Sequence, residues 1–189
     1  RMLADAHAIR IPTAIKVGVC EQQAWLIMQW INEGHRPHDF FDQLAVGLAE
    51  LHRKTVGNEI GLDRDNFLGA APQINGPVDS WPEFFAEQRL GFQIRWASDQ
   101  GLADPGLAGD VEQIIAGLPE LLEGSDGTTS LLHGDLWSGN YLCDDTGVAV
   151  LIDPAVYRGC REAEFGMLQL FGGCPSRFYE AYQEAFPMP

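Results

Sequence analysis

Basic residues are scarce in this sequence, and their scarcity excludes one large class of partners. Of 189 residues, 12 are Lys or Arg and 27 are Asp or Glu, which gives a formal net charge of −15. Nucleic-acid backbones are held by clustered Lys and Arg side chains. We therefore expect no nucleic-acid partner, and an acidic surface that water solvates well.

Long apolar runs and paired cysteines are also missing. No apolar run reaches the roughly 18 residues that a membrane-spanning helix needs, so we expect no membrane partner. The four cysteines (Cys20, Cys143, Cys160 and Cys174) form no C-x-x-C pair, which disfavours a zinc ribbon or a thioredoxin-like site. Free thiols and a start without a signal-peptide pattern favour a cytoplasmic protein. The sequence does not predict the oligomeric state.

What is present is an ordinary globular composition, 46% apolar and 21% charged, in a length typical of one domain or one large lobe. Hydrophobic spacing and turn residues predict a mainly helical protein with a few short strands. The expected strands are residues 14–17, 24–28, 129–132, 141–143 and 148–152, and the last two form a hairpin around the turn at 144–147. The expected helices are residues 2–9, 39–57, 80–98, 104–118, 162–171 and 175–186, with an irregular loop over 61–77. Asp39, Ser80 and Asp104 provide the start signals of three of these helices.

One segment concentrates residues that carry chemistry. A short strand leads into His133, Asp135 and Asn140, whose spacing matches the H-x-D-x-x-x-x-N catalytic loop of kinases, with Gly134 in place of the usual Arg. Asp153 follows at the end of the predicted hairpin. Phosphoryl transfer from ATP needs a carboxylate that accepts the proton of the attacking hydroxyl, and oxygen ligands for Mg²⁺. We predict Asp135 as the catalytic base, and Asn140 and Asp153 as magnesium ligands.

The same segment resembles a particular family. Residues 133–140 have the sequence H-G-D-L-W-S-G-N and are similar to the signature of fructosamine kinases, whereas aminoglycoside phosphotransferases and choline kinases share only the H-G-D and the Asn. Residues 152–157, I-D-P-A-V-Y, resemble the I-D-P-A-x-Y segment of the same family. Further similarity lies at residues 48–52, 65–69, 81–85, 161–164 and 170–173, so the resemblance covers nearly the whole chain.

The resemblance implies the α+β fold of a protein-kinase-like C-terminal lobe, mainly helical, with short strands and a catalytic β-hairpin. It implies ATP-dependent phosphorylation of a sugar hydroxyl on ketosamines, either small molecules or protein-bound adducts, as a repair of glycation. Gln29, Trp30 and Ile31 would form the hinge whose backbone meets adenine. Trp137 and Trp81 are candidates for the sugar site, because aromatic faces suit the C–H surfaces of sugars.

Other parts of a kinase are not found in the sequence. No G-x-G-x-x-G occurs. Lys16, in a T-A-I-K segment like the lysine strand of kinases, lies too close to Trp30 for the helix and strands expected between them, and we interpret it as an exposed side chain. Residues 1–34 are then a remnant of the N-terminal lobe with the hinge, and residues 35–189 a C-terminal catalytic lobe that ends early. With the N-terminal lobe largely absent, we expect such a chain to turn over little.

Three alternatives stay open. A related small-molecule kinase would act on an aminoglycoside, homoserine or a choline-like alcohol. A non-catalytic, pseudokinase-like module would bind nucleotide without turnover, and a metal-dependent hydrolase would be active without ATP. The sequence departs from the family pattern where Cys160 replaces the usual His and Glu164 the usual Asp, and in kinase-like folds the second position often braces the catalytic loop. The sequence does not identify the preferred sugar or amine.

Overall fold

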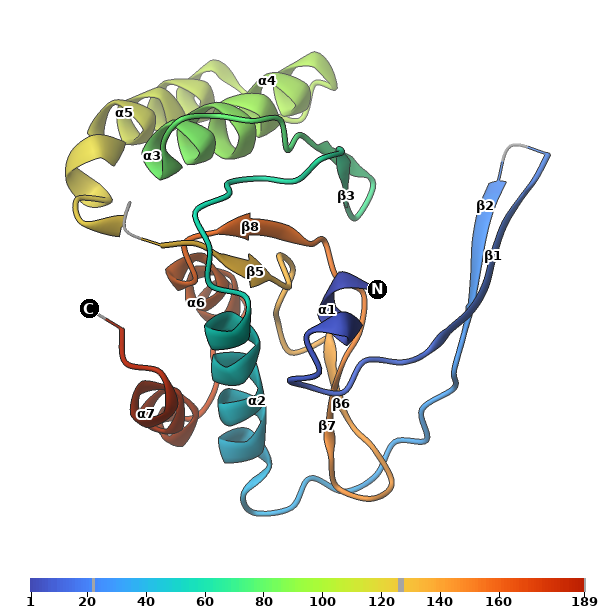
Figure 1. The fold of residues 1–189 in the computed structure, drawn as a ribbon. Helices are drawn as coiled ribbons and strands as arrows, with labels where there is room; N and C mark the ends of the chain where they lie inside the picture. Colours follow the sequence, from blue (N-terminus) through green and yellow to red (C-terminus); the bar gives the residue numbers. More distant parts are fainter. Residues whose placement is uncertain (22, 126–127, 189) are drawn as a thin grey trace. The chain divides into compact units, whose positions relative to one another are not determined.

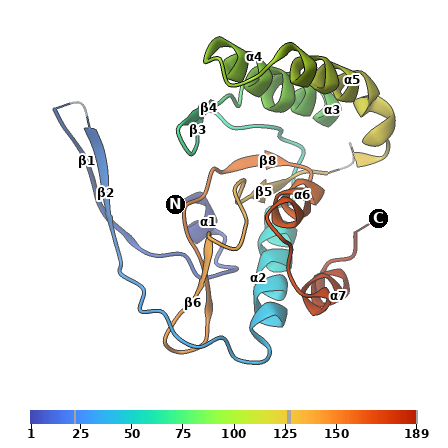
Figure 2. The ribbon, with the colours of Figure 1, turned by 180° about the vertical axis from the view of Figure 1, so that it is seen from behind.

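The computed structural model describes residues 1–21, 23–125 and 128–188, and its backbone falls into two compact units. Unit 1 contains Arg1–Thr55, Asp135–Pro154 and Glu164–Pro189, and unit 2 contains Val56–Gly134 and Ala155–Ala163. Each unit therefore combines segments that are far apart in the sequence. The boundary expected at residue 34 stays a prediction. Figures 1 and 2 draw the elements of both units from opposite sides.

Unit 1 holds two hairpins and two longer helices. Its elements are α1 (Met2–Asp5), β1 (Ala14–Cys20), β2 (Gln23–Met28), α2 (Phe40–Lys54), β6 (Tyr141–Cys143), β7 (Ala149–Leu151), α6 (Glu162–Leu170, in unit 1 from Glu164 on) and α7 (Ser176–Ala185). Strand β1 pairs antiparallel with β2, and β6 with β7, which confirms the four predicted strands. Helix α1 is shorter than expected because His7, with a φ of 48°, leaves the right-handed helical region.

Helices α2 and α7 lie side by side and carry much of the core of unit 1 (Figures 1 and 2). Leu44, Leu48 and Leu51 recur at the spacing of one helical face and are fully buried. Burial of each such side chain contributes about 2 kcal/mol, so this face holds α2 in place. His52 on the same helix is also fully buried, and its Nδ1 lies 2.8 Å from the buried hydroxyl of Tyr182.

Unit 2 is mainly helical, with two small antiparallel sheets. Its elements are β3 (Asn66–Leu68), β4 (Ala71–Gln73), α3 (Trp81–Phe84), the π-helix η1 (Phe85–Gly91), α4 (Phe92–Asp99), α5 (Pro105–Leu121), β5 (Ser130–Leu132) and β8 (Tyr157–Gly159). Strand β3 pairs with β4, and β5 with β8. The predicted strand near residue 130 and the helix that starts after Asp104 are confirmed.

Three features of unit 2 differ from the sequence-based expectation. Residues 61–77, expected to be irregular, contain the β3–β4 hairpin, and strand β8 was not predicted at all. The helix expected over residues 80–98 runs through η1, whose turns are wider than those of an α-helix. Within η1, Arg89 directs its guanidinium at the rings of Phe84 and Tyr157, 4.3 and 4.1 Å from their centres. Local spacing could not predict this inward-facing cation.

Side-chain caps stand at two of the three predicted helix starts. The Ser80 hydroxyl and the Asp104 carboxylate each accept a hydrogen bond from the backbone N–H three residues later, at 3.3 and 2.8 Å. Asp39 occupies the corresponding position before α2, yet its carboxylate accepts a hydrogen bond from the Gln43 side chain at 3.1 Å and caps no backbone group. The expected cap at Asp39 is therefore wrong, because a side chain one turn along competes for the same carboxylate.

This difference predicts that removing the Asp104 carboxylate lowers the free energy of unfolding more than removing the Asp39 carboxylate does. Asp104→Ala should lower the free energy of unfolding by about 1 kcal/mol, because a helix N–H loses its acceptor. Asp39→Ala removes a charge at the same kind of position without removing a cap, and should cost clearly less. Urea denaturation of both variants beside the parent measures the two losses. Equal losses would contradict the capping role of Asp104.

The structure bears on the predictions for the cysteines and for membrane-spanning helices. All four cysteines are free thiols, as predicted. Burial raises the pKa of the Cys160 thiol to about 12, and its Sγ donates a hydrogen bond to the Glu162 carboxylate at 3.1 Å. Among the helices of residues 1–21, 23–125 and 128–188, none combines the length and the apolar character needed to cross a membrane.

Candidate active site

The β6–β7 hairpin brings two of the predicted site residues to one end of a rigid element. Asn140 comes directly before β6 and Asp153 two residues after β7, so strand pairing places both at the same end. The Asn140 carbonyl accepts a hydrogen bond from the Ile152 N–H at 3.0 Å. The Asn140 N–H in turn donates to the Trp137 carbonyl at 2.9 Å, which closes the loop before β6. Backbone bonds therefore fix the position of Asn140 beside the end of β7.

Asp135 and Asn140 contact one another directly. The Asn140 Nδ2 donates to the Asp135 carboxylate at 2.9 Å and to the Asp135 carbonyl at 2.7 Å. Asn140 is 6% exposed, and Asp135 is half-buried. The amide nitrogen is thus used to hold Asp135, and the amide oxygen is the atom of Asn140 that can bind a cation.

The Asp135 carboxyl group lies in a setting that resists its ionisation. Burial raises its pKa above the ordinary value, the hydrogen bond from Asn140 lowers it, and the charge of Asp153 raises it again, with a net upward shift. Two carboxylates therefore interact within this site. Such a pair favours a cation nearby, because the cation stabilises both ionised groups.

Asp153 has an uncommon backbone conformation. Its φ is 51°, in the left-handed region that few residues other than glycine adopt and that Asp tolerates better than most. Its side chain is exposed, immediately after the hairpin and before Pro154. Backbone strain of this kind clusters at functional sites. The turn directs the chain away from β7 at the residue that was predicted to bind magnesium.

A cavity of about 610 Å³ in unit 1 connects the predicted hinge with the predicted metal ligand. Residues 29–31 line it together with Leu142, Ile152 and Asp153. Gly139 also borders it, one residue before Asn140. The apolar side chains suit a flat ring, while the carboxylate stands where a cation could bind. The structure therefore brings together predicted residues that are more than a hundred positions apart in the sequence.

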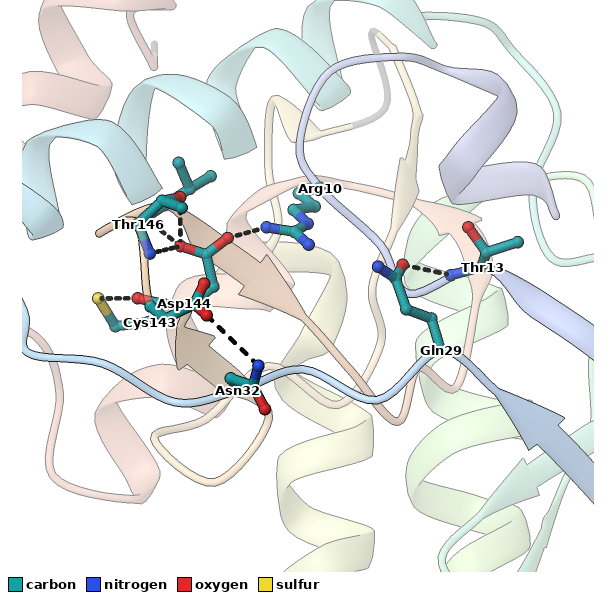
Figure 3. A network of polar contacts seen from close by, with 9 residues as sticks. Arg10, Thr13, Gln29, Asn32, Cys143, Asp144 and Thr146 are labelled. Carbon is teal, nitrogen blue, oxygen red and sulfur yellow. Dashed lines mark hydrogen bonds and ion pairs between the residues drawn. The ribbon is translucent and has the colours of Figure 1, made fainter.

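The three predicted hinge residues, which line this cavity, differ in their hydrogen bonds and in their exposure. The Gln29 N–H donates to the Thr13 carbonyl at 2.8 Å, and the Gln29 side chain accepts from the Thr13 N–H at 3.4 Å (Figure 3). Trp30 is 85% exposed, whereas Ile31 is 8% exposed. Because the Gln29 N–H is used within the protein, the Gln29 carbonyl and the backbone of Trp30 and Ile31 are the groups that could meet a planar base.

The two aromatic candidates for a sugar site lie in different surroundings. Trp137 is half-buried, two residues from Asp135, and packs against Phe171 with ring centres 5.2 Å apart. A side chain at Gly139 would come within 2.5 Å of the Trp137 ring. Trp81 is 2% exposed and lies in the core of unit 2. A sugar-binding role stays a prediction for both residues, and burial leaves Trp81 little surface to offer.

Three side-chain amides in unit 2, two of them buried, form a network that was not predicted from the sequence. Gln73 Nε2 donates to the Ala155 carbonyl at 2.9 Å, and Asn66 Nδ2 to the Val156 carbonyl at 2.8 Å. Asn75, fully buried, donates to the Asn66 side chain at 2.9 Å. These bonds hold the chain directly after Asp153 and Pro154. Of the three amide residues, only Asn66 lies in a segment with family resemblance. The other two could not be predicted, because polar residues in an expected loop carry no signal of burial.

The positions that depart from the family pattern are both buried. Cys160 belongs to the core of unit 2, and Glu164 is 1% exposed at the start of the part of α6 in unit 1. A buried carboxylate in this helix is compatible with a bracing role, which stays a prediction. His133 is fully buried, and its carbonyl accepts a hydrogen bond from the Ala155 N–H at 2.9 Å.

The residues present suit a magnesium ion that is shared with a phosphate ligand. In the part of the chain that the structure describes, no group of three His, Cys, Asp or Glu side chains is arranged to hold a metal. Mg²⁺ in nucleotide sites commonly takes one or two protein ligands, with phosphates and water completing its shell. The Asp153 carboxylate and the Asn140 amide oxygen are donors of this kind.

Similarity to curated proteins covers the chain from end to end. The family described as fructosamine kinase matches residues 1–189. A protein of Synechocystis named probable ketoamine kinase is 37% identical over 185 residues, which are 98% of this chain and 61% of that protein. The chloroplastic protein-ribulosamine 3-kinase of Oryza sativa subsp. japonica is 39% identical over 189 residues, 97% of this chain and 53% of that protein. The chain thus spans less than two thirds of the length of these relatives.

Solved structures agree with the sequence comparison. A Thermobifida fusca protein described as a fructosamine-3-kinase superposes with a TM-score of 0.82 at 34% identity, over 99% of this chain and 63% of that one. A Haemophilus somnus counterpart reaches 0.88 at 28% identity, over 100% and 62%. A type VIII aminoglycoside-3'-phosphotransferase, at 0.61 and 20% identity over 99% and 70%, shares the fold. The predicted α+β, protein-kinase-like fold class is confirmed, whereas the absence of an N-terminal lobe stays a prediction.

Proposed function

Since the chain belongs to the fructosamine kinase family, we propose that its protein is an ATP-dependent kinase that phosphorylates a sugar hydroxyl of ketosamines. The observation that carries the proposal is the hydrogen bond between Asn140 and Asp135 beside a hairpin whose Asp153 lines the same cavity as residues 29–31. One short segment thereby offers a carboxylate for the acceptor hydroxyl and oxygen ligands for a cation on the nucleotide phosphates.

Each of the candidate site residues has a separate role in the proposed reaction. Asp135 orients the attacking hydroxyl and accepts its proton, and Asn140 fixes the carboxylate that does so. Asn140 and Asp153 would hold Mg²⁺, which neutralises charge on the phosphates. Residues 29–31 would meet the adenine ring along the apolar side of the cavity. Fixed positions of these groups account for most of the rate enhancement in such a reaction, because phosphoryl transfer depends on alignment and charge neutralisation.

The choice of a ketosamine as acceptor rests on the relatives. Two of them carry the names ketoamine kinase and ribulosamine 3-kinase, at 37% and 39% identity. The aminoglycoside phosphotransferase, at 20% identity, supports the fold and not the substrate. Free thiols are consistent with a reducing compartment, and we place the protein in the cytoplasm on that ground.

A coupled ADP-release assay on the full-length protein tests this function. Fructoselysine or ribuloselysine should release ADP well above the rate without acceptor, and an aminoglycoside should not. Loss of the ketosamine in a reaction without ATP, followed by chromatography, would indicate the metal-dependent hydrolase alternative instead. Background rates with all three acceptors would overturn the proposal, and a fast rate with the aminoglycoside alone would replace it by the related kinase.

A further inference from the structure

The turn of the β6–β7 hairpin contains a buried carboxylate that the proposed chemistry does not use. Asp144 is 1% exposed, although the sequence indicated only a turn residue. One of its oxygens accepts hydrogen bonds from the Thr146 N–H and hydroxyl at 2.9 and 2.7 Å, and from the Val148 N–H at 2.9 Å. The other oxygen forms an ion pair with Arg10 (Figure 3). Removal of one member of such a pair leaves the other charge without compensation.

Arg10 belongs to the segment that leads into the β1–β2 hairpin. Its carbonyl accepts a hydrogen bond from the Leu151 N–H at 3.0 Å, and its backbone forms a parallel bridge with Val150. Pro12, two residues later, lines the 610 Å³ cavity. The ion pair to Asp144 therefore fixes, by its side chain, a segment whose backbone already rests on β7 and whose continuation forms part of the cavity wall.

The segment that leaves the β1–β2 hairpin rests on the same turn. The Gly34 N–H donates to the Cys143 carbonyl at 2.9 Å, and Glu33 forms an antiparallel bridge with Asp144. A Cβ at position 34 would lie 2.5 Å from the Asp144 carbonyl oxygen, so the two backbones touch without room for a side chain. Glu33 lines the cavity, as do residues 29–31 just before it. Both segments that border the cavity are thus anchored at the Asp144 turn.

We propose that Asp144 is a positioning residue for nucleotide binding. Through Arg10 its carboxylate holds the segment at residues 10–12 against the hairpin, beside the segment at residues 29–34 that its backbone already contacts, and so sets the width of the cavity that both segments line. Asp144 acts through these segments and not by contact with the ligand. The inference rests on the proposed function only in taking the occupant to be a nucleotide.

Asp144→Asn in the full-length protein tests this role. Asparagine keeps an acceptor for Thr146 and Val148 and loses the charge that faces Arg10. The Kd of the non-hydrolysable analogue AMP-PNP, measured by calorimetry, should rise about tenfold, because the cavity walls lose their fixed spacing. In steady-state kinetics the KM for ATP should rise in the same proportion, while kcat and the KM for fructoselysine stay within about twofold.

The matched control is Asp145→Asn, on the same turn. Asp145 is exposed and its carboxylate accepts one longer hydrogen bond, from Asn32 at 3.3 Å. Its variant loses the same charge and should bind AMP-PNP like the parent. An unchanged Kd in Asp144→Asn, or equal rises in the KM of both substrates, would overturn the positioning role.

A double-mutant cycle separates the ion pair from a general loss of structure. Arg10→Gln should weaken AMP-PNP binding as much as Asp144→Asn, and the double variant should be no weaker than either single variant, because both remove one interaction. Additive losses would overturn the inference. If Asp144→Asn fails to fold, Arg10→Gln alone still gives the KM comparison. The calorimetric titration needs no sugar acceptor, so it tests the role of Asp144 even if the protein proves not to phosphorylate ketosamines.

Discussion

Replacing Asp135 by asparagine is expected to lower kcat for ketosamine phosphorylation about a thousandfold, with little change in ATP binding. Asparagine has the shape of aspartate, so an oxygen can still accept the hydrogen bond from Asn140 Nδ2. What is lost is the carboxylate that we propose to take the proton of the attacking hydroxyl. The effect should fall on kcat, because that proton moves in the transition state and not when the substrate binds. ADP-release kinetics on the full-length protein, with fructoselysine as acceptor, measure it.

Asp145→Asn is the control for this experiment as well, because it removes one exposed carboxylate charge at the far end of the same hairpin. Its rate should match the parent rate, and the urea midpoints of all three proteins should agree within error. An Asp135→Asn variant as active as the parent would refute the base role. A similar loss in both variants would point to overall charge instead of position.

The central part of the site could be predicted because its residues are close in sequence. Asp135 and Asn140 belong to one loop with a fixed spacing, and Asp153 follows the hairpin that this loop begins. Asp144 could not be predicted in the same way. It stands next to Asp145 in a turn-type tetrapeptide, and nothing local separates the two carboxylates. Part of the difference arises from Arg10, which approaches Asp144 from the other end of the chain and is invisible to any local pattern.

The secondary structure shows the same contrast between elements that have a local sequence signal and elements that depend on distant segments. The apolar stripe of α2 and the cap at Asp104 are local signals, and both elements were predicted. Strands β3, β4 and β8 have three residues each and contain Asn, Pro or Arg within them, so they form no apolar run. Strands β5, β6 and β7 are as short, but their apolar residues stand out in the sequence, and they were predicted. The widened helix η1 carries Arg89, whose cation packs on Tyr157 in a distant segment. Amphipathic helices and short apolar strands can therefore be predicted from the sequence, while short strands that contain polar residues or Pro cannot.

Substituting alanine for Gly134 is expected to lower the free energy of unfolding by at least about 3 kcal/mol. Gly134 has a φ of 82°, and a Cβ there would lie 2.0 Å from the Ala155 carbonyl oxygen. That oxygen cannot easily retreat, because it accepts a hydrogen bond from the buried Gln73 side chain at 2.9 Å and the Ala155 N–H is bonded to the His133 carbonyl at 2.9 Å. The kinase loop usually carries Arg at this position, and here the approach of two backbones leaves no room for any side chain.

Gly124→Ala is the control that measures the cost of the backbone strain without a steric clash. Gly124 has a φ of 85°, nearly that of Gly134, and no heavy atom of the described residues comes within 4 Å of a Cβ built there. Alanine at position 124 should therefore cost about 1 kcal/mol, the strain of a left-handed conformation alone. Urea denaturation gives both values. Equal losses would mean that the Ala155 segment can move aside, and that Gly134 is needed for its φ and not for the contact. The larger loss at Gly134 would establish that the residue before Asp135 is held by a backbone contact that only glycine permits.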